Sequence, residues 1–331
     1  MIQFDVFNGD ADGIFALLQL RKVSPQTSTL ISGVKRDINL LAQVTATAGD
    51  KVTVLDISFD KNRADVLRLL EAGATLDYCD HHFAGAAVLH PNLHTNINTG
   101  AAWCTSLLVD RHLNRSQPQH LQPPHRLSHW AIAGAFGDNL TDVAQRYGQR
   151  LGLSRVQLQR LQRLGELVNY NGYGLSLADV AFAPTTLYQR LLQYPSADDA
   201  ASGEELQRLQ QYWQQDLAQA QRLAPCHQGV HQRIYRLPDL PWARRLSGPL
   251  ANQWHQQHPH CAIAVLLPLP DGCGDYQVSL RVPRGFRLGA DAFCRQFPSG
   301  GGRTLAAGIN RLPSADVDLF VTRFADCFVR D

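Results

Sequence analysis

The chain has 331 residues, of which 44% are hydrophobic and 18% are charged, and its formal net charge is +2 at pH 7. This length favours two domains, and the composition is that of a soluble globular protein rather than a disordered or fibrous one. This net charge is by itself too small to indicate a nucleic-acid coat or a membrane surface. No apolar run approaches the roughly 18 residues that a membrane helix needs.

Seven cysteines are scattered along the chain and form no CxxC pair. This spacing favours free thiols in a reducing compartment over a disulfide framework. The chain also starts with an expected strand rather than with a basic segment and an apolar signal core. We therefore expect a cytoplasmic protein.

The N-terminal third alternates β-branched or aromatic runs with helical patterns. We predict strands at 2–8, 29–32, 52–56, 74–79 and 93–97. We predict helices at 11–22, 38–48, 62–72 and 101–113. Such alternation indicates a parallel α/β sheet with both faces covered. Ligands of these sheets bind beyond the carboxyl ends of the strands.

The pattern is mainly helical from a polar connection at 116–124 to about residue 225, and strands return after residue 230. We predict helices at 130–138, over most of 141–170, at 185–193 and at 204–223, with a loop at 169–174 and a turn at 195–202. We predict later strands at 234–237, 261–267 and 276–281, and later helices at 246–258, 290–297 and 315–329. The expected organisation is a catalytic domain at 1–185, a helical connector at 186–225 and a smaller α/β domain at 226–331.

Acidic residues follow three of the predicted strands. They are Asp10 and Asp12 after the first strand, Asp56 after the third, and Asp80-His81-His82 after the fourth. Because the carboxyl ends of parallel strands lie at one edge of a sheet, we expect these clusters to meet. Asp138 is a further candidate, since a carboxylate at a helix C-terminus opposes the helix dipole unless a cation compensates it.

Each of these residues also has a purely structural interpretation. Asp10 or Asp12 can cap a helix, Asp56 can cap the helix near residue 62, and either histidine can be a core residue bonded to backbone. Together, however, the carboxylates and an imidazole form a donor set that favours Mn²⁺ or Mg²⁺ over a thiolate zinc site. Two ions that share Asp56 can activate water and stabilise the leaving oxygen of a phosphoester.

A glycine run at 300–302 is followed by Arg303. We predict that this run is a phosphate-binding loop, because backbone amides without side chains can approach a phosphate closely. A flexible surface loop is the alternative. Nearby arginines, including Arg281, Arg284 and Arg287, either face a bound phosphate or form a solvated surface.

The order of these motifs resembles the DHH phosphoesterase superfamily. The matching motifs are Asp10-Ala11-Asp12-Gly13, Asp56, Asp80-His81-His82, Asp138, Val278-Ser279-Leu280-Arg281 and the run from Gly300 to Gly308. The last two resemble motifs of the DHH-associated C-terminal domain. The resemblance implies Mn²⁺-dependent hydrolysis of phosphate esters in a cleft between the two domains.

The resemblance also implies a role for each matched residue. Two Mn²⁺ ions, with Mg²⁺ as the alternative, would be held by Asp10, Asp12, Asp56, His81 and Asp138. The catalytic set would be Asp80, His81 and His82, in which Asp80 orients a ligand and His82 faces the substrate phosphate. The substrate would also contact Ser279, Arg281, Gly300, Gly301, Gly302 and Arg303.

Two positions depart from the family pattern. Many relatives have a metal-binding histidine where this chain has Val6, so one ion is expected to bind weakly or to recruit water or Asn8. The glycine motif usually ends in histidine, whereas here it ends in Arg303. Arginine can still clamp a phosphate, and it does so independently of pH.

The expected function is hydrolysis of short linear oligonucleotides, with dinucleotides such as pGpG first, which would connect the protein to cyclic-di-GMP signalling. The near-neutral charge disfavours long nucleic acid as a partner. The alternatives are a RecJ-like single-strand exonuclease, a nucleotide phosphomonoesterase and a non-catalytic nucleotide sensor. No membrane partner is expected, and a homodimer is left open.

Overall fold

The computed structural model describes residues 1–116, 127–270 and 272–329. The chain forms two compact units, Met1–Trp213 and Gln214–Asp331. Their boundary falls within helix α9 (Glu204–Ala220). The expected connector, 186–225, spans this boundary, and its residues up to 213 belong to the first unit. Most of the polar connection at 116–124 lies outside the described residues.

The first unit is built on a five-stranded sheet in which every neighbouring pair is parallel. Its order is β2-β1-β3-β4-β5. The strands are β1 (Gln3–Phe7), β2 (Thr29–Ser32), β3 (Lys51–Leu55), β4 (Thr75–Asp80) and β5 (Leu93–Ile97). The predicted parallel α/β sheet is therefore confirmed.

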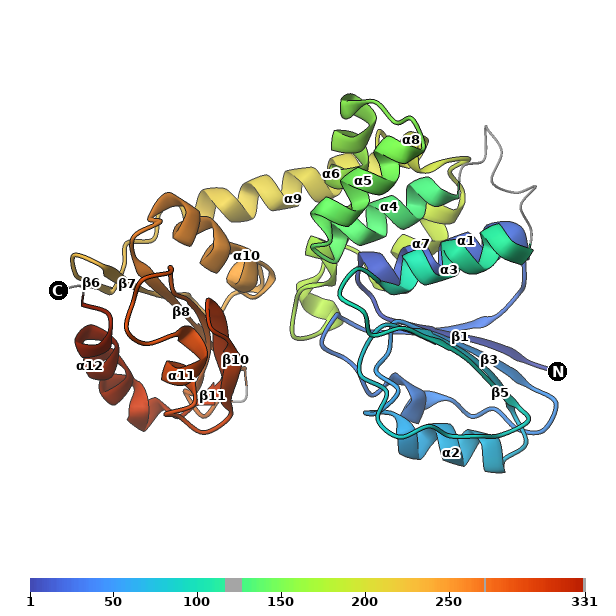
Figure 1. The fold of residues 1–331 in the computed structure, drawn as a ribbon, viewed down its shortest axis with the longest axis horizontal. Coiled ribbons are helices and arrows are strands. Elements are labelled where there is room, and N and C mark those ends of the chain that lie inside the picture. Colours follow the sequence, from blue (N-terminus) through green and yellow to red (C-terminus); the bar gives the residue numbers. More distant parts are fainter. Residues whose placement is uncertain (117–126, 271, 330–331) are drawn as a thin grey trace. The chain divides into compact units, whose positions relative to one another are not determined.

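Helices cover both faces of this sheet (Figure 1). On one face α1 (Ala11–Val23), α3 (Thr105–Ser116) and α7 (Pro184–Leu192) contact the strands, and on the other face α2 (Arg63–Glu71) does. The helices α4 (Ser128–Gly137), α5 (Thr141–Arg150), α6 (Arg155–Gly172) and α8 (Ala197–Ala200) pack mainly against other helices of this unit. Alternate side chains of a strand point to opposite faces. Val54 accordingly packs in the cluster with α2, whereas Leu55 packs in the larger cluster with α1, α3 and α4.

Two local predictions in this unit are wrong. The helix expected at 38–48 is only a 3₁₀ turn, η1 (Leu40–Gln43). The loop expected at 169–174 begins inside a helix, because α6 continues to Gly172. The backbone of Asp10 explains this glycine, since a Cβ at Gly172 would lie 3.0 Å from the Asp10 Cα. The glycine permits close packing and does not mark a turn.

The second unit contains a mixed six-stranded sheet of order β10-β11-β9-β8-β7-β6. Its strands are β6 (His227–Gln228), β7 (Gln232–Arg236), β8 (Ala262–Pro268), β9 (Tyr276–Arg281), β10 (Gly300–Arg303) and β11 (Ala306–Leu312). Its helices are α10 (Pro241–Gln257), α11 (Ala290–Cys294) and α12 (Val317–Cys327). On β7, Tyr235 stacks on Trp254 of α10, whereas Ile234 packs in the cluster of α11 and α12. Helix α10 therefore covers one face of this sheet, and α11 and α12 cover the other.

The seven cysteines are all free thiols, as expected. Within the described ranges, the structure contains no helix that is both long enough and apolar enough to span a membrane.

Candidate metal centre

The turn between β1 and α1 fixes two carboxylates. Asp10 is the N-cap of α1, and its Oδ1 accepts the backbone N–H groups of Asp12 and Gly13 at 3.0 and 3.1 Å. Gly13 must lack a side chain, since a Cβ there would lie 2.3 Å from the carbonyl oxygen of Asn8. The capping interpretation of Asp10 is therefore correct, but it leaves the second carboxylate oxygen for other contacts.

Asp12 is held by the start of another helix. Its two carboxylate oxygens accept the backbone N–H groups of Thr105 at 2.6 Å and Ser106 at 2.8 Å, in the first turn of α3. The N-terminal end of a helix favours a negative charge, so α3 both orients and stabilises this carboxylate. Asp12 is buried.

Asp56 follows β3 in a left-handed backbone conformation, with φ of 60°. Few residue types other than glycine adopt this conformation, and Asp is among them. Its Oδ1 accepts the hydroxyl of Thr105 at 3.1 Å. The α3 N-terminus thus contacts both Asp12 and Asp56 and holds them at one position beyond the strand ends.

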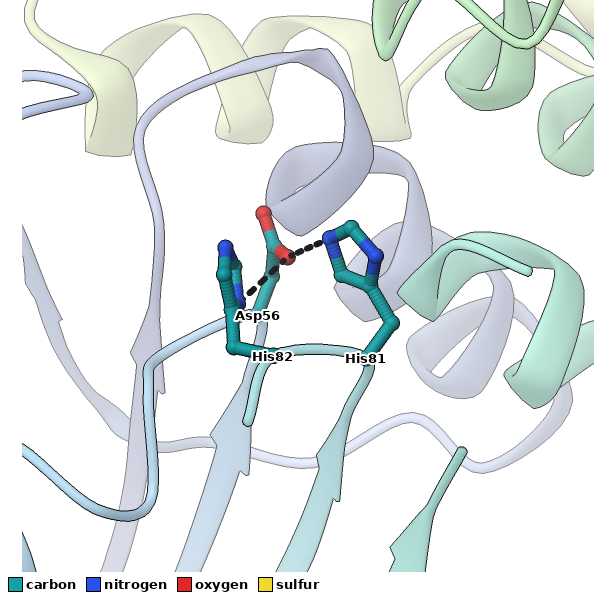
Figure 2. A group of neighbouring side chains, drawn as sticks. All are labelled: Asp56, His81 and His82. Atoms are coloured by element: carbon teal, nitrogen blue, oxygen red, sulfur yellow. Dashed lines mark ion pairs between the residues drawn. The ribbon is translucent and has the colours of Figure 1, made fainter. Parts of the chain in front are cut away.

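His81 brings three carboxylates together. Its Nε2 lies 3.4 Å from Asp56 Oδ1, 3.8 Å from Asp138 Oδ2 and 4.0 Å from Asp12 Oδ2. Figure 2 shows His81 and His82 extending from adjacent positions toward Asp56. Two sets of ligand atoms are close enough to hold an ion, one from Asp56, His81 and His82 and the other from Asp12, His81 and Asp138.

Asp80 supports His82. Its Oδ1 lies 2.7 Å from Nδ1 of His82, and this hydrogen bond is the main reason that the pKa of His82 is raised. Asp80 is fully buried, and its Oδ2 has no hydrogen-bond partner among the described residues. A buried carboxylate oxygen without a partner is costly. A nearby cation would reduce that cost.

Asp138 lies at the C-cap of α4, where its N–H donates to the Gly134 carbonyl. Burial and then the charge of Asp12 raise its pKa to about 7. The pKa of Asp56 also lies well above the usual range, because of burial and the charges of Asp10 and Asp12. These carboxylates repel one another in the protein alone.

Lys35 is the cation that the sequence interpretation missed. Its Nζ lies 2.6 Å from Asp10 Oδ2, 3.2 Å from Asn169 Oδ1 and 3.9 Å from Asp138 Oδ1. Burial alone would raise the pKa of Asp10, but the charge and hydrogen bond of Lys35 outweigh it and lower that pKa. The sequence did contain one signal for Lys35, which is its place shortly after the carboxyl end of strand β2, at the same edge of the sheet as the acidic residues.

The donor set fits a hard divalent cation. One set of converging ligand atoms comes from Asp12, His81 and Asp138, and the other comes from Asp56, His81 and His82. Carboxylate oxygens combined with imidazole nitrogens suit Mn²⁺ or Mg²⁺. Such an ion would also relieve the repulsion that raises the pKa of Asp138. Asp10 belongs to neither set of converging ligand atoms among the described residues.

Val6, where the resemblance led us to expect a histidine, contributes nothing to this centre. Val6 is fully buried in the hydrophobic cluster that also contains Val54 and Val66. Asn8 is also engaged, because its Oδ1 accepts the N–H of Asp10 at 3.2 Å and its Nδ2 donates to the Lys35 carbonyl at 3.4 Å.

The glycine run of the second unit forms the edge strand β10, so the predicted loop is wrong. Gly302 has φ of 142°, and a Cβ there would lie 2.5 Å from the Ala307 Cα. By contrast, a Cβ at Gly301 would meet open space. Ser279 and Arg281 lie on β9, and Arg281 Nε donates to Asn252 at 2.6 Å.

No protein-family model and no curated protein matches the sequence. Solved structures do match its fold. RecJ from Thermus thermophilus in complex with Mn²⁺ has a TM-score of 0.58 and 18% identity, over 98% of this chain and 51% of RecJ. This chain therefore spans about half the length of that protein.

Two further structures match over most of their own length. The pGpG-specific phosphodiesterase PggH from Vibrio cholerae has a TM-score of 0.56 and 13% identity, over 99% of this chain and 100% of PggH. A manganese-bound exonuclease RecJ has a TM-score of 0.55 and 19% identity, over 99% of this chain and 91% of that chain. The chain therefore shares the fold of these RecJ and PggH structures, in agreement with the fold that its resemblance to DHH phosphoesterases led us to expect.

Proposed function

We propose that this protein is a metal-dependent phosphodiesterase that hydrolyses short linear oligonucleotides, and most readily dinucleotides such as pGpG, to mononucleotides. The observation that carries this proposal is the convergence of Asp12, Asp56 and Asp138 on Nε2 of His81. These residues come from separate segments, and their mutual repulsion is costly unless a cation is bound.

In this proposal the ion is Mn²⁺, held by the three converging carboxylates and His81. When bound, it supplies an activated water and a positive charge for the phosphoester. The backbone N–H groups of Thr105 and Ser106 keep the Asp12 carboxylate in place. This support reduces the reorganisation needed when the ion binds.

His82 is the proposed contact to the substrate phosphate. Its side chain is 44% exposed, and Asp80 fixes its Nδ1. The raised pKa increases the fraction of imidazolium near neutral pH. Both properties suit a side chain that donates a hydrogen bond to a phosphate oxygen.

The second unit is proposed to bind the 5′-phosphate end of the substrate through the β9 and β10 residues. They are Ser279, Arg281, Gly300, Gly301, Gly302 and Arg303. Gly301 has the open surroundings that close approach of a phosphate requires. Arg303 supplies a permanent positive charge. Its substitution by Ala should raise KM more than it lowers kcat.

A short substrate is preferred for two reasons. The fold is similar to that of the pGpG-specific phosphodiesterase PggH over 99% of this chain and 100% of PggH. The net charge of +2 also provides little attraction for a long polyanion. The second candidate is a RecJ-like single-strand exonuclease, which is favoured by the likeness of the fold to two RecJ structures.

The test is an assay of the purified protein with Mn²⁺ on five substrates. They are pGpG, pApA, a longer RNA, single-stranded DNA and a nucleotide with a terminal phosphomonoester. We expect dinucleotides to be cleaved fastest and His81→Ala to abolish cleavage. The matched control is His94→Ala, on neighbouring β5, because His94 is exposed and forms a surface pair with Asp77. Cleavage of long DNA without cleavage of dinucleotides would favour the exonuclease. Binding of pGpG without turnover in any metal would favour a sensor.

A further inference from the structure

The Lys35 ammonium lies where the carboxylates of the candidate centre need a positive charge. It contacts Asp10 at 2.6 Å and lies 3.9 Å from Asp138, and Asn169 Oδ1 accepts a third contact at 3.2 Å. The Lys35 side chain is only 25% exposed. Three oxygen atoms from different segments thus surround one nitrogen.

The backbone holds Lys35 at this position. The N–H of Lys35 donates to the Gly172 carbonyl at 2.8 Å, at the end of α6. Its carbonyl accepts a hydrogen bond from Asn8 Nδ2. The ammonium also lies 5.7 Å from the centre of the Tyr173 ring, which attracts cations. A freely moving surface lysine would not have so many fixed contacts.

Asp10 has few remaining ways to bind an ion. Its Oδ1 accepts two N–H groups of the α1 N-terminus, and its Oδ2 accepts the Lys35 ammonium. Val6, four residues before Asp10, packs in the core and supplies no ligand atom. Both sets of converging ligand atoms among the described residues depend on His81, and Asp10, which Lys35 occupies, belongs to neither.

We propose that the Lys35 ammonium takes the place of a second divalent ion, so that the centre binds one ion rather than two. This inference rests on the proposed function. The ammonium is a fixed positive charge with three N–H donors, which can balance the carboxylates and attract a phosphate. It cannot acidify water as a metal can, so activation of the nucleophile depends on the single ion.

The test is the number of Mn²⁺ ions bound per chain, measured by equilibrium dialysis with elemental analysis and by electron paramagnetic resonance. We expect one ion in the wild type and two in Lys35→Met, which removes the charge and keeps the chain length. In that variant, spin coupling between the ions should appear in the spectrum. Lys61→Met, which removes an exposed lysine from the same unit, should bind one ion.

Two other variants keep the inference testable if Lys35→Met does not fold. Lys35→Arg retains the charge and should bind one ion, and Asp10→Asn should also retain one because Asp10 is not a ligand of it. Two ions in the wild type, one ion in folded Lys35→Met, or loss of the ion in Asp10→Asn would each overturn the inference. A wild-type protein that binds no ion would instead contradict the proposed function.

Discussion

Replacing Asp138 by Asn should stabilise the metal-free protein, and by an amount that depends on pH. The pKa of Asp138 rises from 3.8 to about 7 because of burial and then the charge of Asp12. An acid whose pKa is raised in the folded state destabilises that state above the folded pKa. The wild type therefore loses stability as pH rises from about 4 to about 7, and Asp138→Asn avoids this loss.

The size of the effect follows from the same shift. A difference of about three pKa units corresponds to about 4 kcal/mol at pH 8. Because 21% of the Asp138 side chain is exposed, solvent screening reduces this to about 2 kcal/mol. For a unit of this size the apparent Tm should rise by roughly 4–8 °C at pH 8, and the gain should fall toward zero near pH 4.

Differential scanning fluorimetry in chelator and then in Mn²⁺ measures both parts of the prediction. At a concentration of about 100 Kd, Mn²⁺ should stabilise the wild type by about 2.7 kcal/mol, and it should stabilise Asp138→Asn much less. Glu166→Gln is the control, because Glu166 is 46% exposed and its ion pair lies on the surface. A metal-free Asp138→Asn that is less stable than the wild type at pH 8 would refute the reasoning.

The remaining predictions concern metal affinity, the histidine support and helix packing. Mn²⁺ must displace protons from carboxylates of raised pKa. Its Kd should therefore increase by up to about tenfold per pH unit as the pH falls below about 7. A Kd that is constant from pH 8 to pH 6, measured by electron paramagnetic resonance, would contradict this. Asp80→Asn should lower kcat/KM by about 10–100-fold, because His82 loses its charged partner, and unchanged kinetics would exclude that support. Gly165→Ala should lower the stability of the first unit to urea by about 2 kcal/mol or more, because its Cβ would lie 2.0 Å from the Ala133 carbonyl.

Much of the candidate centre could be predicted because strand topology alone decides which residues meet. Asp12, Asp56 and His81 each follow a parallel strand, and the carboxyl ends of such strands share one edge. Asp138 could be predicted for another reason, since its carboxylate opposes the dipole of α4 and requires compensation. Neither conclusion needed any side-chain detail.

Lys35 could not be distinguished from a solvated lysine, because what makes it special is distant in the sequence. Its partner Asn169 lies 134 residues away, on a segment that we predicted to be a loop. The Asn-Gly sequence at 171–172 is typical of turns. Here, tertiary packing against Asp10 keeps it helical, and that packing has no signature in the local pattern.

The glycine run was mistaken for a loop for a related reason. Local propensity disfavours strands made of glycine. In the structure, Gly300–Arg303 pairs with β11, and close approach to neighbouring backbone requires glycine at Gly300 and Gly302. Pairing with a neighbouring strand therefore overrides the local preference.

The most direct measurement of the central claim is the rate of pGpG hydrolysis by chelator-treated protein before and after Mn²⁺ is added back. We expect no GMP without Mn²⁺, and restoration of turnover by Mn²⁺ in the wild type but not in Asp56→Asn, whose side chain keeps the same shape and tolerates the left-handed backbone. Hydrolysis that persists in chelator, or equal activity of Asp56→Asn, would contradict the claim that these carboxylates form a metal-dependent phosphodiesterase site.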